Sequence, residues 1–174
     1  TYWQVLPFGM IDECNSPYKS YSAFAGNPYF IDLPTLKEKG LITEEELFSA
    51  EQKTPYSCEY ERLYKERYTL LMKASERVGD KSKIEEFIRK NPRISEFAEF
   101  MALKTSNGGR EWREFYTDEK DPDVLFMWQF IQYEFFTRWA EIKKYANEKG
   151  IGIIGDMPIY VSFDSSDVYW SRRF

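Results

Sequence analysis

The first apolar segment of the chain is short, and a long polar stretch follows it. Residues 3–7 (Trp-Gln-Val-Leu-Pro) favour a β-strand, and Pro7 followed by Gly9 indicates where that strand ends. From Gly9 to Pro28 the chain is rich in Asn, Ser, Gly and Pro, which form turns more readily than they extend a sheet. We therefore predict a buried strand that leads into a long loop.

The pattern after Leu33 is helical. Thr43 and Glu46 have the spacing of a capping box, in which each side chain bonds the exposed backbone N–H of the other residue. Residues 59–78 carry apolar side chains at helical intervals, and we expect Gly79 to cap the C-terminus of that helix. This part of the chain therefore predicts at least two helices.

Two more helices are expected before residue 110. Ser82 is predicted to begin a short helix that Pro92 limits. Ser95 is predicted to open the next helix, which ends at residues 107–109 (Asn-Gly-Gly).

The longest predicted helix begins at Asp121-Pro122 and ends at Gly150. Its apolar positions recur with a period near 3.6, and we interpret their face as core: Val124, Trp128, Ile131, Phe135, Trp139, Ile142 and Ala146.

A compact apolar strand, residues 151–155, follows that helix and ends in Asp156. A helix followed by such a strand is the order of a β/α crossover. With an early strand near residue 5 and helices between, the pattern predicts an α/β barrel or an open sheet that carries an inserted helical subdomain.

Composition narrows the class of protein. Aromatic residues make up 18% of the chain, which suits sugar binding and equally a large core. The formal charge of −5 disfavours nucleic acid, whose binding depends on Lys and Arg. The chain has no apolar run long enough for a membrane span, and its first residues do not resemble a signal peptide. We therefore expect a soluble, unexported protein with no nucleic acid or membrane as partner.

Cysteine and histidine content limits the chemistry. Cys14 and Cys58 lie in different segments and form no disulfide framework, so we expect free thiols and a cytoplasmic protein. The absence of histidine excludes Ser-His-Asp and Cys-His catalysis and most zinc sites from this chain. We expect no cofactor and no metal, and acid–base chemistry would require carboxylates.

Three carboxylates are candidates for a site. Asp156 directly follows an apolar strand, and ligands in parallel α/β folds gather where strands end. Asp164 and Asp167 are possible partners of a carboxylate pair. For all three the alternative is a loop or helix-capping role, which composition alone favours.

The loop from Ser16 to Pro28 combines hydroxyl groups, amides and aromatic rings, including Tyr18 and Tyr21. A sugar, with polar edges and C–H faces, requires such a combination. An ordinary tight loop uses the same residue types, so this alternative stays open.

Taken together, several segments closely resemble the amylomaltase family. The resemblance spans nearly the whole chain and includes Phe100-Met-Ala-Leu-Lys104 with Gly108-Gly109, and Gln132-Tyr-Glu-Phe-Phe136 with Arg138-Trp139. The segments that carry it most strongly are Trp3–Pro7, Ser16-Pro-Tyr-Lys-Ser-Tyr-Ser-Ala-Phe-Ala-Gly-Asn-Pro28, Ile154-Gly-Asp-Met-Pro-Ile-Tyr-Val161 and Asp164–Val168.

The resemblance implies an α/β fold, a partial (β/α)8 TIM barrel with a mostly helical inserted subdomain. We expect residues 1–33 to form an early barrel strand and substrate loop, residues 34–119 the helical subdomain, and residues 120–174 a barrel helix, strand and following loop. The implied activity is that of a 4-alpha-glucanotransferase, which moves segments of α-1,4-glucan, as in malto-oligosaccharides or starch, between acceptor sugars. The implied mechanism is retaining, with a covalent glycosyl-enzyme.

The resemblance also implies roles for three residues. Asp156 helps to hold the sugar at the cleavage subsite, while Ser16 and Tyr18 line the donor side. The nucleophile and the acid/base belong to motifs that residues 1–174 do not contain, so we expect this chain alone to be inactive. The chain has Glu13-Cys14-Asn15 where the family commonly has Tyr-Gly-Asp, so a ring contact at position 13 is not carried over, and Trp170 receives no role.

Two other classes of function remain open. One is a carbohydrate-binding remnant of the same family, which binds malto-oligosaccharides without turnover. The other is a helical interaction domain that presents Trp128, Phe135 and Trp139 on its surface. Oligomeric state and acceptor preference do not follow from the sequence.

Overall fold

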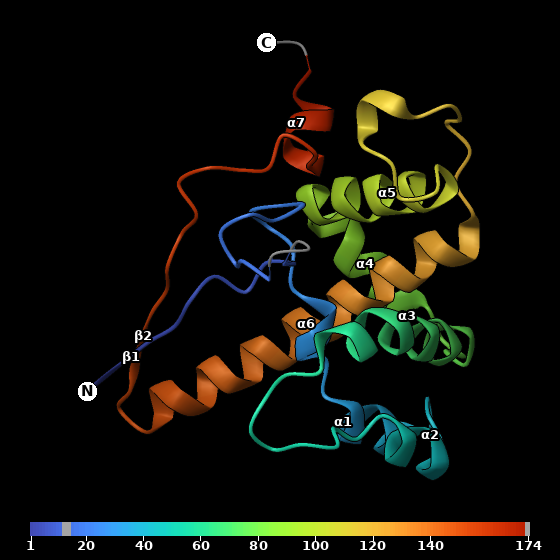
Figure 1. The fold of residues 1–174 in the computed structure, drawn as a ribbon. Coiled ribbons are helices and arrows are strands. Elements are labelled where there is room, and N and C mark those ends of the chain that lie inside the picture. Colours follow the sequence, from blue (N-terminus) through green and yellow to red (C-terminus); the bar gives the residue numbers. More distant parts are fainter. Residues whose placement is uncertain (12–14, 173–174) are drawn as a thin grey trace.

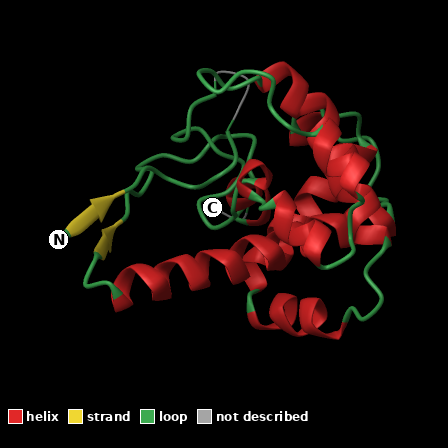
Figure 2. Ribbon diagram, turned by 90° about the horizontal axis from the view of Figure 1, so that it is seen from below, coloured by secondary structure: helices red, strands yellow, loops and turns green. Residues whose placement is uncertain are grey.

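The computed structural model describes residues 1–11 and 15–172, which are mostly helical (Figures 1 and 2). Glu13 and Cys14 lie outside the described residues. In chain order the elements are β1 (Tyr2–Gln4), the 3-10 helix η1 (Pro28–Phe30), α1 (Leu33–Glu38), α2 (Glu44–Ser49), α3 (Tyr60–Glu76), α4 (Ser82–Lys90), α5 (Pro92–Ser106), the 3-10 helix η2 (Trp112–Glu114), α6 (Pro122–Glu148), β2 (Gly152–Ile154) and α7 (Ser166–Trp170).

The two strands pair in parallel, with Trp3 opposite Ile153. The parallel pairing agrees with the predicted crossover, because the chain must return through a long connection before it pairs in this direction. The prediction of a buried early strand was wrong: Tyr2–Gln4 are exposed, and burial begins at Val5. Among the described residues, few elements cover the faces of this two-stranded ribbon, apart from the end of α6.

Helix α6 is the longest element, and α3, α4 and α5 all pack against it. The side chain of Asp121 caps its N-terminus by accepting hydrogen bonds from the backbone N–H groups of Asp123 and Val124. At the other end Gly150 has a φ of 71°, and the N–H of Ile151 bonds the carbonyl oxygen of Ala146, as in a Schellman motif. Both predicted ends are confirmed.

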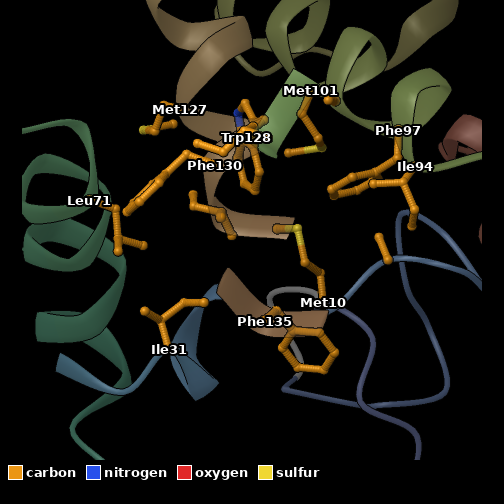
Figure 3. Packing of buried hydrophobic residues seen from close by; sticks show 14 of the residues in the cluster. Met10, Ile31, Leu71, Ile94, Phe97, Met101, Met127, Trp128, Phe130 and Phe135 are labelled. Carbon is orange, nitrogen blue, oxygen red and sulfur yellow. The ribbon is translucent and has the colours of Figure 1, made fainter. Parts of the chain in front are cut away.

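The core lies around the N-terminal half of α6, between α3, α4 and α5 (Figures 1 and 3). Trp128 is 3% exposed and Ile131 is fully buried, which confirms this part of the predicted face. The face is interrupted at Ile142, which is 40% exposed where α6 leaves the other helices and extends toward the strands, while Ala146 near the end of the helix is buried as predicted. The interaction-domain hypothesis is wrong for Trp128 and for Phe135, since both side chains lie in the core.

Two predicted helix boundaries were wrong. Gly79 does not cap α3, which ends at Glu76 with Arg77 at the C-cap, and the φ of Gly79 is not in the left-handed region. Ser95 does not open α5, which begins at Pro92. Proline has no N–H to donate and a fixed φ, so the residue that limits α4 also suits the first turn of the next helix. The predicted capping box of Thr43 and Glu46 is confirmed at the start of α2.

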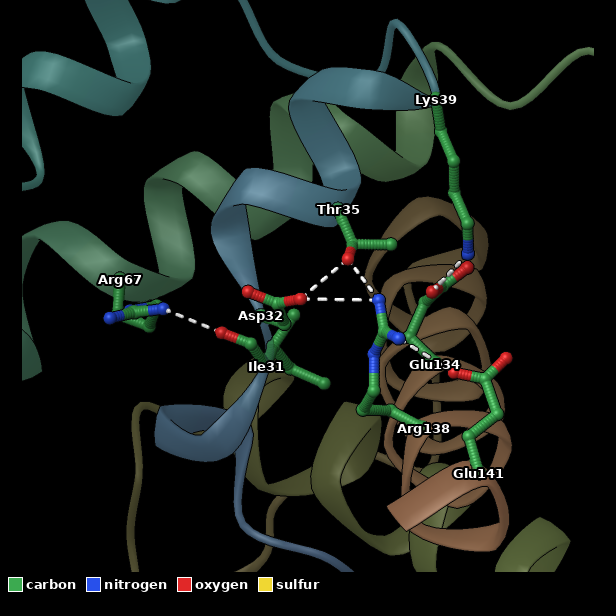
Figure 4. Close-up of polar contacts among 8 residues, drawn as sticks. All are labelled: Ile31, Asp32, Thr35, Lys39, Arg67, Glu134, Arg138 and Glu141. Atoms are coloured by element: carbon green, nitrogen blue, oxygen red, sulfur yellow. Dashed lines mark hydrogen bonds and ion pairs between the residues drawn. The ribbon is translucent and has the colours of Figure 1, made fainter. Parts of the chain in front are cut away.

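Ion pairs fix the segment after η1 against α6 (Figure 4). Arg138 bonds Asp32 at 3.1 Å and also contacts the hydroxyl group of Thr35, while Lys39 pairs with Glu134 at 2.5 Å. Glu134 is buried, so its charge is stabilised by a partner that reaches it from the end of α1. Among the described residues, no helix is long and apolar enough to cross a membrane.

Candidate functional site

The structure brings two of the predicted site residues into direct contact. The hydroxyl group of Tyr18 donates a hydrogen bond to Oδ2 of Asp156 at 2.8 Å, although the residues are 138 positions apart. Asp156 follows β2, and Tyr18 belongs to the loop that follows β1, so the parallel pairing of the strands places both residues beyond the same end of the sheet. The parallel pairing therefore brings together two residues that lie far apart in the sequence.

The third predicted residue lies beside this pair. Ser16 Oγ accepts a hydrogen bond from the backbone N–H of Tyr18 at 3.3 Å, and the carbonyl oxygen of Ser16 accepts one from Lys19 at 3.4 Å. These bonds form a tight turn that presents the Tyr18 ring, which is 47% exposed. Ser16, Tyr18 and Asp156 therefore form one candidate site.

The hydrogen bond affects the charge state of the site. It is the main cause that raises the pKa of the Tyr18 phenol above its ordinary value of 10.0, and burial and the negative charge of Asp156 act in the same direction. Because the phenol stays protonated near neutral pH, it acts as a donor to the carboxylate. A carboxylate has further lone pairs with which to accept a hydrogen bond from a hydroxyl group of a ligand.

A hollow of about 580 Å³ adjoins Tyr18. Aromatic and polar side chains line it together, among them Tyr21, Tyr160, Phe163 and Asp164. Phe163 stacks on Trp112 with ring centroids 5.4 Å apart, so this wall is supported from behind. Rings and hydroxyl groups around an open hollow suit a sugar chain.

A larger hollow, of about 970 Å³, is bounded by α3, α5, α6 and the early loop, and methionines such as Met101 and Met127 contribute to its walls. Tyr21 and Lys104 line both hollows, but Tyr18 lines only the smaller one. We therefore take the smaller hollow as the candidate ligand site, because Tyr18, the hydrogen-bond partner of Asp156, lines it.

The other two candidate carboxylates have structural partners. Asp164 pairs with the buried Lys104 and accepts a hydrogen bond from the backbone N–H of Trp112 at 3.1 Å. Asp167 accepts a hydrogen bond from the backbone N–H of Ala23 at 3.0 Å. The N-cap of α7 is Ser165, and not an aspartate. Asp164 and Asp167 therefore connect segments of the fold: Asp164 has the alternative role of a loop residue, while Asp167 lies in the first turn of α7 and is neither a loop residue nor the N-cap.

Asp156 is not a helix cap either, since α7 is the next helix and Ser165 occupies its N-cap position. Trp170, to which no role was assigned, donates from Nε1 to the carbonyl oxygen of Glu96 at 2.9 Å and so joins α7 to α5. Cys58 is an exposed free thiol, as predicted.

Sequence reasoning missed the role of Gln132, which is fully buried on α6 and bonds both backbone groups of Gly26. A signal was present, because Gln132 follows Trp128 by four positions and therefore lies on the apolar face of the helix. A polar residue on such a face needs a partner.

Comparison with known proteins identifies the family. A family model described as 4-alpha-glucanotransferase matches residues 1–174. The chain belongs to the 4-alpha-glucanotransferase family. It is 40% identical over 192 residues to the 4-alpha-glucanotransferase of Clostridium butyricum, covering 98% of this chain and 38% of the relative. It is also 40% identical over 187 residues to the enzyme of Streptococcus pneumoniae, covering 97% of this chain and 37% of the relative.

Solved structures of the family agree. An amylomaltase from Streptococcus agalactiae, in complex with acarbose, matches with a TM-score of 0.87 at 33% identity, over 97% of this chain and 38% of that one. The amylomaltase of Corynebacterium glutamicum shares the fold, with a TM-score of 0.78 at 17% identity, over 98% of this chain and 27% of that one. The chain thus spans about 38% of the length of the glucanotransferase of C. butyricum.

Proposed function

We propose that residues 1–174 supply a donor-side glucan site of a 4-alpha-glucanotransferase that acts on malto-oligosaccharides or starch-type glucans. The observation that carries this proposal is the 2.8 Å hydrogen bond between Tyr18 and Asp156, in a chain whose whole length matches the family. It supports a site at which a ring face and a fixed carboxylate meet beside an open hollow.

The fold proposed for this activity is part of a (β/α)8 barrel. Residues 1–33 provide an early strand and the substrate loop, residues 34–119 an inserted helical subdomain, and residues 120–174 a barrel helix, the next strand and its loop. The parallel pairing of β1 with β2 supports this division, because neighbouring strands of such barrels are parallel and separated by helices. A cytoplasmic location also belongs to the proposal and rests on the sequence alone.

Each of the three site residues has a proposed task. Tyr18 offers its ring to a sugar face and orients Asp156, while Ser16 shapes the turn that presents the ring. Asp156 holds a hydroxyl group of the sugar at the cleavage subsite. Such a contact accelerates the reaction only if it is stronger in the transition state than in the ground state.

The covalent steps are proposed to use carboxylates outside residues 1–174. One attacks the anomeric carbon and a second protonates the departing sugar, then activates the acceptor hydroxyl that displaces the glycosyl-enzyme. The contribution of this chain is to hold the donor in the orientation that these steps require.

Product analysis tests the proposal. The protein as its source makes it, incubated with maltotriose, should form both shorter and longer oligosaccharides, and Asp156→Asn should lose most of this activity. Asp118→Asn is the matched control, because it removes the same charge from an exposed residue of the loop before α6. Equilibrium binding of maltotriose without new products would instead support the alternative, a carbohydrate-binding remnant of the family.

A further inference from the structure

Gln132 is a buried polar residue that the candidate site does not use directly. Its side chain is fully buried in the middle of α6, where polar groups are costly unless they are paired. Nε2 donates to the carbonyl oxygen of Gly26 at 2.9 Å, and Oε1 accepts from the N–H of Gly26 at 2.8 Å. One amide side chain thus satisfies both backbone groups of a residue 106 positions away.

Gly26 is also held by close packing. A Cβ atom built on Gly26 would lie 2.1 Å from Cδ1 of Phe135, so the backbone of Gly26 runs directly against this ring of α6. The next residue, Asn27, is buried and donates its N–H to the carbonyl oxygen of Phe8 at 2.9 Å. The loop therefore has a rigid attachment at its C-terminal end.

From this attachment the loop leads back to the candidate site through further fixed points. Ala23 N–H bonds Asp167, and the carbonyl oxygen of Tyr21 accepts a hydrogen bond from Ser166 N–H at 2.9 Å. Both partners belong to the first turn of α7. Tyr18, the next fixed point, meets Asp156, so the loop is held between α6 and the segment that follows β2.

We propose that Gln132 is a positioning residue for the glucan site. By fixing the backbone of Gly26, Gln132 positions the C-terminal end of the loop, and thereby the place at which Tyr18 meets Asp156. This inference rests on the proposed function. Its consequence is kinetic, because a displacement of about 1 Å in a positioning group can reduce a rate on the order of 100-fold.

Gln132→Glu tests the inference through its pH dependence. A protonated carboxyl group keeps both bonds, since its O–H donates to the carbonyl oxygen of Gly26 and its C=O accepts from the N–H. The ionised form has no donor, so it cannot bond the carbonyl oxygen of Gly26 and its negative charge repels that oxygen. Burial raises the pKa of the introduced carboxyl, so the bonded form persists at acid pH and is lost as pH rises.

The measurement is kcat/KM for maltotriose between about pH 5 and pH 8, on the protein as its source makes it and below the unfolding temperature of each variant. We expect the ratio of kcat/KM of Gln132→Glu to kcat/KM of the wild type to fall roughly tenfold or more as pH rises across this range. Ile131→Val is the matched control: it is the neighbouring, fully buried residue of α6, and its ratio should not vary with pH.

A second variant covers the case in which Gln132→Glu does not fold. Gln132→Met keeps the length of the side chain and removes both bonds, and kcat/KM should fall roughly 10- to 100-fold at every pH. A pH-independent ratio for Gln132→Glu, together with wild-type kcat/KM in Gln132→Met, overturns the inference and leaves Gln132 a structural residue. If the wild-type protein itself forms no products, the proposed function has failed instead.

Discussion

Replacing Gly26 by alanine tests the close approach of the early loop to α6. The added Cβ would lie 2.1 Å from Cδ1 and 2.3 Å from Cγ of Phe135, far inside van der Waals contact. Neither the ring of Phe135 nor the backbone of Gly26 can move easily, because Phe135 is buried and Gln132 makes two hydrogen bonds to the backbone of Gly26. The substitution must therefore displace the ring or the loop.

The expected loss of folding stability is the sum of two contributions, overpacking and weakened hydrogen bonds. Overpacking a core site costs about 1–3 kcal/mol. If the loop shifts in addition, two hydrogen bonds that contribute about 0.5–1.5 kcal/mol each are weakened as well. The sum is about 2–6 kcal/mol, which in a domain of this size lowers the Tm by roughly 5–20 °C.

Thermal unfolding followed by circular dichroism measures the effect. Gly79→Ala is the control, because an added Cβ there meets no atom within 4 Å and the Tm should stay close to that of the wild type. Adding Phe135→Leu to Gly26→Ala should restore part of the loss, since the smaller side chain makes room. A Gly26→Ala variant with the Tm of the wild type would refute the close packing of the loop on α6.

Three further predictions concern the polar contacts. The hydrogen bond from Arg77 is the main cause that lowers the pKa of Glu46 from its ordinary 4.5 to about 2, so its contribution to stability is present above pH 4.5 and is lost as pH falls toward 2. Arg77→Gln should weaken this acid dependence of the Tm. Lys104→Met leaves the carboxylate of Asp164 without its cation and should cost about 3–5 kcal/mol in chemical denaturation. Adding Asp164→Asn should restore part of this loss, because the amide carries no charge and can still accept from the N–H of Trp112. Tyr18→Phe keeps the ring but removes the donor to Asp156, and should lower kcat/KM for maltotriose roughly tenfold without lowering the Tm.

Features that depend on neighbouring residues could be predicted from the sequence. The capping box of Thr43 and Glu46 and the start of α6 at Asp121 follow from side chains that bond backbone groups two or three positions away. The parallel strands followed from the order of elements, because a helical connection favours a parallel return. That order also predicted a site where the strands end, and Tyr18 and Asp156 meet there.

Features that depend on distant residues could not be predicted. Burial of β1 was overestimated because an apolar strand is buried only where other elements cover it. The attachment of Gly26 to Gln132 joins positions 106 apart, and neither residue has a local pattern that specifies the other. Pro92 illustrates a different limit, since one residue both limits α4 and begins α5.

The most direct test of the central claim is a crystal structure of the protein, as its source makes it, with acarbose bound. Acarbose is a suitable probe because a related amylomaltase was solved in complex with it. We predict a sugar ring against Tyr18 and a sugar hydroxyl group within hydrogen-bond distance of Asp156. Acarbose bound elsewhere, with the Tyr18–Asp156 hydrogen bond intact and no sugar beside it, would contradict the proposed site.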